Sequence, residues 1–214
     1  MPAHYTPLFS ALLAFIVSLV AGPRIITYLK RLKLGQQVRE DGPKTHLGKA
    51  GTPTMGGILI IVATVIAVVV FPPLSDHNII LLFATVGFAA LGFFDDFIKV
   101  VAKRSLGLRA REKLVGQFGI AVLVALYAWA RIGTDLFFPF AQNTIVLPPW
   151  LYLPFTVLVL VGTVNAVNLT DGLDGLAAGS TAIAATAFGL ITWLLGYPDL
   201  ALFSGALVGA CLGF

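Results

Sequence analysis

The sequence predicts an all-α, polytopic membrane protein with about seven transmembrane helices. Of its 214 residues, 58% are hydrophobic, whereas soluble globular domains are roughly 45–50% apolar. The mean hydropathy is +0.94. A bilayer core about 30 Å thick needs about 17–25 apolar residues per helix. Seven apolar blocks reach or approach that length, at 7–29, 56–73, 78–94, 114–130, 150–167, 176–195 and 200–214.

The blocks are predicted to be helices because they lack the alternating pattern of barrel strands. No basic segment precedes the first block, so we expect a retained helix rather than a signal peptide. The connection at 131–149 contains three prolines, which predict a loop or a short hairpin. Cys211 has no second cysteine to pair with, so we expect a small buried apolar residue.

The basic residues predict the orientation in the membrane. All but one of the 14 lysines and arginines fall at 24–49 or 99–113, and Arg131 is the exception. Two helices separate these stretches, so both lie on one side, which the positive-inside rule makes cytoplasmic. We therefore predict one integral-membrane domain, 1–214, with cytoplasmic loops at about 30–55, 95–113 and 165–176 and the N-terminus outside. By themselves, the cations are better explained as topology signals that contact anionic lipid.

Asp95 and Asp96, in the run GFFDDFIK, form the sharpest candidate site. Adjacent helical residues point about 100° apart, so both carboxylates can serve one site only near a helix end. A Mg²⁺ ligand beside a general base would suit such a pair. The simpler interpretation is an interfacial pair that ends the helix, with Lys99 as its ion partner.

A second candidate is NAVNLTDGLDGLAAG, from Asn165 to Gly179. Asn165 and Asn168 share a helical face, and the two Asp-Gly pairs that follow predict a bend. Two amides and two carboxylates, of Asp171 and Asp174, would therefore converge on this bend. The alternative is a pair of ordinary turns between helices.

Two weaker candidates carry cations. KAGTPTMGG, from Lys49 to Gly57, offers an ammonium group, two threonine hydroxyls and glycines that allow a close backbone approach. GLRAREKLVGQ, from Gly107 to Gln117, offers arginines and Lys113 for a diphosphate. By itself, the first stretch is better explained as a turn that enters a helix, and the second is a signal of low specificity, because phosphate recognition by Arg and Lys is common.

Together, and in this order, the four motifs resemble the polyprenyl-phosphate N-acetylhexosamine-1-phosphate transferase superfamily, and GTPTMGG resembles its muramoyl-pentapeptide branch. The resemblance implies ten transmembrane helices, commonly a homodimer, in the bacterial inner membrane. It also implies Mg²⁺-dependent transfer of phospho-MurNAc-pentapeptide from UDP-MurNAc-pentapeptide to undecaprenyl phosphate. The products would be lipid I and UMP, in peptidoglycan synthesis.

The resemblance also implies roles for particular residues. Asp95 matches the proposed base, with Asp96 beside it as a catalytic residue, and Asp96 and Asp171 are the implied Mg²⁺ ligands. The positions implied to bind substrate or nucleotide are Lys49, Thr54, Lys103, Lys113, Asn165, Asn168, Asp171, Leu173 and Asp174. The family continues with a further metal-binding Asp and a His-rich loop, so we expect this chain, which stops at Phe214, to be truncated and inactive alone.

Two alternatives stay open at this stage. A sister transferase that moves GlcNAc-1-phosphate to the same carrier would share Asp95, Asp96 and the Asn-Asp bend. An ion-coupled transporter would use the acid pair as a relay, but it would need acids near the midplane and broken helices. A nucleic-acid-binding protein is excluded because the basic residues flank membrane spans.

Overall fold

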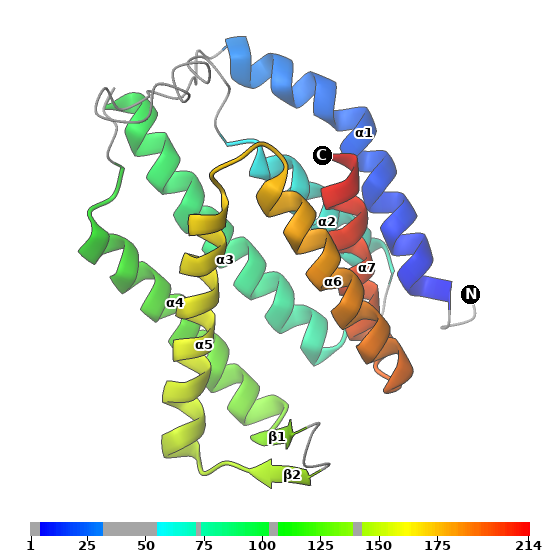
Figure 1. The fold of residues 1–214 in the computed structure, drawn as a ribbon, viewed down its shortest axis with the longest axis vertical. Helices are drawn as coiled ribbons and strands as arrows, with labels where there is room; N and C mark the ends of the chain where they lie inside the picture. The colour runs from blue at the N-terminus through cyan, green and yellow to red at the C-terminus, as the bar shows by residue number, and fades with distance from the viewer. Residues whose placement is uncertain (1–4, 32–54, 72–73, 103–106, 139–142) are drawn as a thin grey trace.

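A computed structural model of the chain describes residues 5–31, 55–71, 74–102, 107–138 and 143–214. Within these ranges it contains seven α-helices and a two-stranded hairpin (Figure 1). In chain order the elements are α1 Thr6–Arg31, α2 Gly57–Val70, α3 Asp76–Val101, α4 Ala110–Arg131, β1 Asp135–Phe138, β2 Asn143–Val146, α5 Pro149–Thr170, α6 Leu176–Leu194 and α7 Pro198–Gly213. The all-α polytopic prediction is confirmed.

Five of the helices, α1, α3, α4, α5 and α6, are long and apolar enough to cross a membrane, whereas α2 and α7 are shorter. The largest difference from the predicted blocks is in α3, which has 26 residues and ends at Val101 rather than near 94. At 1.5 Å per residue this helix is about 39 Å long, more than a bilayer core requires. Hydropathy marks the part of a helix inside lipid, and the charged last turns of α3 lie beyond that part.

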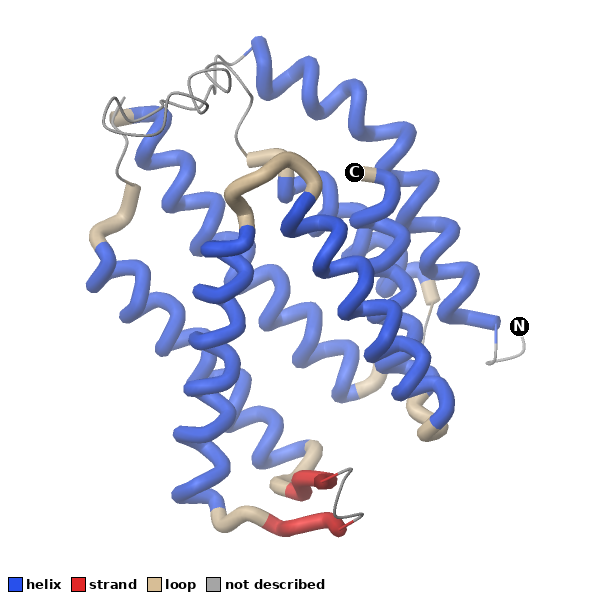
Figure 2. The backbone as a smooth tube through the Cα atoms, in the orientation of Figure 1, coloured by secondary structure: helices blue, strands red, loops and turns tan. Residues whose placement is uncertain are grey.

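Successive helices alternate in direction, so the C-terminus of α3, the C-terminus of α5 and the loop into α6 lie on the same side of the bundle (Figure 1). The tube drawing shows the hairpin at the opposite end, between α4 and α5 (Figure 2). β1 and β2 pair antiparallel, with Asp135 opposite Val146, which confirms the hairpin expected at 131–149. We call the side with the α3 C-terminus and the 171–175 loop the site end.

The helices pack in two groups. Small side chains of α1, α2 and α7, including Ala14, Ala63 and Ala206, form one buried cluster with Leu202 and Phe203. Gly209 of α7 lies so close to the Ala11 carbonyl of α1 that a Cβ there would overlap it. Such small residues let helix backbones approach closely in lipid. This close packing of the first helix against the seventh positions one half of the bundle.

The second group joins α3, α4 and α5. Ala121 and Ala125 of α4 are fully buried and cluster with Val157 and Val161 of α5. Phe88 of α3 packs against the same cluster. α4 begins and α5 ends at the site end, so the residues before Ala121 on α4 and after Val161 on α5 lie between this apolar contact and that end. The contact fixes the position of the two helices that carry the basic and the Asn-rich motifs.

Candidate functional site

Asp95 and Asp96 share one cation, Lys99. The Lys99 Nζ atom lies 2.7 Å from Asp95 Oδ2 and 2.8 Å from Asp96 Oδ1. These are the i,i+4 and i,i+3 spacings that place side chains on one helix face. The ammonium group therefore brings together two carboxylates that would otherwise point apart. The pair lies within α3, more than a turn before its end, and the ion partner from the simpler interpretation is present.

Asp95 also contacts the segment that leads into α4. The Leu108 N–H donates to Asp95 Oδ1 at 2.9 Å. Gly107 packs against the same residue, and a Cβ on this glycine would overlap the backbone and carboxylate oxygens of Asp95. The Asp95 side chain is only 13% exposed, against 35% for Asp96. The two aspartates therefore differ: Asp95 is held by the chain around it, and Asp96 is more open.

A second polar contact joins α4 to α5. Lys113 Nζ lies 3.0 Å from Asn168 Oδ1, and the Lys113 ammonium also attracts the Asp95 carboxylate electrostatically. Lys113 therefore joins the start of α4 to the Asn-rich end of α5. The structure brings these two motifs to one end of the bundle, as the sequence predicted.

One turn from Lys113, Gln117 and Asn165 form a reciprocal amide pair. Asn165 Nδ2 donates to Gln117 Oε1 at 2.8 Å, and Gln117 Nε2 donates to Asn165 Oδ1 at 3.4 Å. Asn165 Nδ2 also donates to the Val161 carbonyl at 2.8 Å. Gln117 is fully buried. Both N–H groups of Asn165 are thus engaged with α4 and α5.

The bend between α5 and α6 has the predicted helix break. The Asp171 N–H donates to the Val167 carbonyl at 3.2 Å and ends α5. Gly175 has φ of +77° and precedes α6, a left-handed conformation that glycine adopts without strain. Asp171, Leu173 and Asp174 are exposed at this bend. Their implied contacts with a nucleotide stay predictions.

Three implied site residues, Lys49, Thr54 and Lys103, lie outside the described residues. Of KAGTPTMGG, the structure describes only the last three residues. Met55 has φ of 69°, which is uncommon for a non-glycine residue. A Cβ on Gly56 would lie 3.0 Å from the Phe214 ring. The last residues of this motif, where α2 begins, therefore pack against the end of α7.

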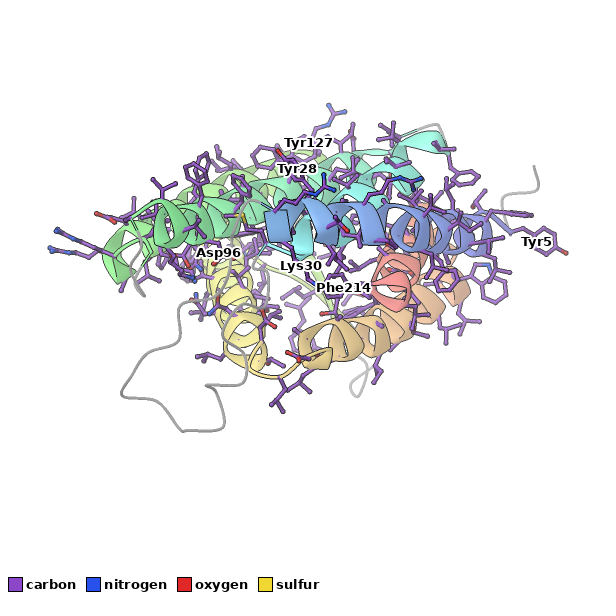
Figure 3. The ribbon with its side chains drawn as sticks, turned by 90° about the horizontal axis from the view of Figure 1, so that it is seen from above. Tyr5, Tyr28, Lys30, Asp96, Tyr127 and Phe214 are labelled. Carbon is purple, nitrogen blue, oxygen red and sulfur yellow. The ribbon has the colours of Figure 1, made fainter. Side chains whose placement is uncertain are left out.

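The two arginines of the basic motif lie at the start of α4, with Arg109 just before the helix and Arg111 in its first turn. Arg109 and Arg111 line an open hollow of about 570 Å³ with Glu112 and Val115. The Arg109 N–H donates to Glu112 Oε2 at 2.8 Å and caps the helix. In the view from above (Figure 3), the labelled Asp96 lies apart from the labelled Phe214 at the end of α7. Of the basic motif, Lys113 is the cation in contact with the Asn-rich helix end.

The described residues supply carboxylate oxygens of the kind that Mg²⁺ prefers. Among them, however, no group of three or more His, Cys, Asp or Glu side chains is placed as metal ligands would be. Asp96 is engaged by Lys99 on α3, and Asp171 lies at the end of α5. The fit to a metal ion is therefore partial, and the implied ligand pair stays a prediction.

Sequence reasoning missed the partners that hold the site residues in place. Gly107 is a lone glycine before a helix, and nothing in the sequence indicates its contact with Asp95. Gln117 appeared only as the last residue of the basic motif, although it lies four residues from Lys113, a spacing that places both on one face of α4.

Comparison with known proteins agrees with the resemblance of the motifs. The sequence profile of glycosyl transferase family 4 matches residues 78–214. Residues 49–61 match the phospho-N-acetylmuramoyl-pentapeptide-transferase signature 1.

Among curated relatives, phospho-N-acetylmuramoyl-pentapeptide-transferase of Thermoanaerobacter sp. (strain X514) is 50% identical over 207 residues, covering 97% of this chain. The proteins of the same name from Bacillus subtilis (strain 168) and Caldicellulosiruptor bescii are each 47% identical, over 212 and 207 residues respectively. The chain spans 65% of the length of the first two relatives and 64% of the third.

Proposed function

Because the chain belongs to glycosyl transferase family 4, we propose that it carries out phospho-sugar transfer from a nucleotide to a membrane lipid. The donor is UDP-MurNAc-pentapeptide, the acceptor is undecaprenyl phosphate, and the products are lipid I and UMP. This choice of donor and acceptor follows the resemblance of the motifs. The signature match at residues 49–61 and the name of the relatives support the pentapeptide donor.

One observation carries this proposal: the segment that leads into α4 contacts Asp95 of α3, and Lys113, near the start of α4, contacts Asn168 of α5. Asp95 is held against the start of α4, and Lys113 on the first turns of α4 contacts Asn168 at 3.0 Å. Transfer between two phosphate groups brings negative charges together, and cations must neutralise them. The Lys113 ammonium group, at the same site end as the aspartate carboxylates and the Asn168 amide, suits that chemistry.

In the proposed reaction an oxygen of the lipid phosphate attacks the sugar-linked phosphorus of the diphosphate. A P–O bond to the lipid phosphate forms, the P–O bond to UMP breaks, and UMP leaves. Asp95 would accept the proton of a protonated lipid phosphate, with Asp96 beside it. Lys113, Asn168, Asp171, Leu173 and Asp174 would bind the nucleotide substrate, together with Lys49, Thr54 and Lys103.

Mg²⁺ is part of this proposal, with Asp96 and Asp171 as the residues that would hold it. When bound, the ion would neutralise charge on the diphosphate. The protein is proposed to act in the inner membrane of a bacterial cell, as a homodimer, with the site end facing the cytoplasm. The basic residues at 24–49 and 99–113 support that orientation.

The deciding experiment follows radiolabel into a butanol-extractable lipid. The protein as its gene encodes it is supplied with undecaprenyl phosphate, Mg²⁺ and either labelled UDP-MurNAc-pentapeptide or labelled UDP-GlcNAc. We expect label in the lipid fraction from the pentapeptide donor only. Transfer from UDP-GlcNAc alone would instead identify the sister transferase, and transfer from neither donor would contradict the proposal.

A further inference from the structure

Asn165 was assigned to the substrate by resemblance, but its surroundings suggest another role. Its Nδ2 group donates to Gln117 Oε1 and to the Val161 carbonyl, both at 2.8 Å. Its Oδ1 atom faces Gln117 Nε2 at 3.4 Å. The side chain is therefore engaged with the protein at both of its polar atoms. A substrate ligand at this position would have to break these contacts.

The amide pair belongs to a regular series of contacts between α4 and α5. Since the helices are antiparallel, a step of about one turn along α4 meets a step of about one turn back along α5. Ala121 and Ala125 of α4 cluster with Val157 and Val161 of α5. Gln117 and Asn165 come next toward the site end, and Lys113 with Asn168 comes last.

The apolar part of this series tolerates small rotations because alanine and valine contacts are not directional. The amide pair does not tolerate them. Gln117 is fully buried, so a rotation of α4 would leave its amide without a partner where water cannot replace it. Single buried amides fix the register of packed helices in the same way.

We propose that Gln117 and Asn165 form a positioning pair that aligns Lys113 of α4 with Asn168 of α5. This inference rests on the proposed function, because it gives the pair its purpose: to hold two substrate-binding side chains in register. Asn165 is thereby a positioning residue rather than a substrate ligand. The chemistry at the site belongs to Lys113 and Asn168.

The test uses the whole gene product and compares its variants with the wild type. The variants are Gln117→Leu, Asn165→Leu, the double Leu variant, and the exchange Gln117→Asn with Asn165→Gln. The exchange keeps two amides and the same number of methylenes. Each variant is measured for KM and kcat with UDP-MurNAc-pentapeptide and for its thermal unfolding temperature.

Each Leu variant is expected to raise KM roughly 3- to 20-fold, the range of buried interhelical hydrogen bonds in membranes, with a smaller change in kcat. The double Leu variant is expected to lose no more than either single variant, because the interaction is already gone. The exchange variant is expected to recover a KM within about threefold of the wild type.

Four outcomes would overturn the proposal. An unchanged KM with a lowered unfolding temperature would show that the pair only stabilises the fold. Loss of activity in every Asn165 variant, with no coupling to Gln117 and no recovery on exchange, would show that Asn165 contacts the substrate directly. An inactive wild type would overturn the proposed function and the positioning role with it, whereas an active wild type with uncoupled variants would overturn the positioning role alone.

Discussion

Gly107 packs against Asp95 with no space for a methyl group between them. The contact fixes the segment before α4 on the surface of α3, where the Leu108 N–H donates to the Asp95 carboxylate. A glycine outside any helix thus determines how an acid within α3 is oriented. The consequences of this contact can be measured.

Gly107→Ala is expected to lower the rate of UMP release roughly 10- to 100-fold, because a displacement of about 1 Å near reacting groups has effects of that size. The added Cβ must displace both the carbonyl oxygen and the carboxylate of Asp95. Gly119→Ala is the matched control, since it lies on α4 with no atom near its Cβ position. Equal rates for the two variants would contradict a role for the Gly107 contact.

Asp95→Asn is expected to reduce UMP release at least about 100-fold, because the amide cannot accept a proton as a general base does. The measurement is UMP released from UDP-MurNAc-pentapeptide by the purified protein. Asp135→Asn serves as the control, because Asp135 is an exposed acid in the hairpin at the opposite end. Turnover near the wild-type rate would exclude Asp95 as an essential group.

Lys99→Gln is expected to slow transfer roughly tenfold, because it removes the ammonium that holds both carboxylates in place. Lys99→Arg should retain more activity than the glutamine variant, since it keeps the charge. The control is Lys30→Gln, an exposed lysine in the last turn of α1. If Lys99→Gln and Lys30→Gln have the same kcat, the bridging ammonium has no catalytic importance.

Asp171→Ala is expected to lower kcat/KM for the nucleotide substrate about tenfold, the effect of losing one charged contact. The end of α5 should survive, because its backbone bond from the Asp171 N–H to the Val167 carbonyl does not need the side chain. Asp135→Ala is the matched control. An unchanged kcat/KM would remove Asp171 from the site.

Gly209→Val is expected to destabilise the protein by about 1–3 kcal/mol through overpacking. The added side chain would collide with the Ala11 carbonyl and force α7 away from α1. Gly162→Val on α5 is the control, since its Cβ position has open space. Thermal unfolding in detergent measures both variants, and a Gly209 variant as stable as the Gly162 variant would contradict close α1–α7 packing.

The sequence was a good guide to the bundle and to the end at which the polar motifs gather. Hydrophobic blocks identified all seven helices of the part of the chain that the structure describes, because lipid requires long apolar segments whatever the rest of the fold does. Their ends were less well predicted. The charged last turns of α3 were assigned to a loop, although a helix can continue beyond the apolar segment.

The tertiary structure alone decided which residues touch. Ser10 of α1 donates to the Leu202 carbonyl at 2.8 Å, although 192 residues separate them. Asp95 meets Leu108, and Gln117 meets Asn165, for the same reason: helix packing brings together faces that the chain order does not relate. Composition and local pattern determine which segments span the lipid, because the free energy of transfer from water to lipid depends on the residues of each segment alone. Which side chains contact each other across the bundle depends on the rotation of each helix about its axis and on the distance between helices. Only the close packing of all the helices together determines these two quantities.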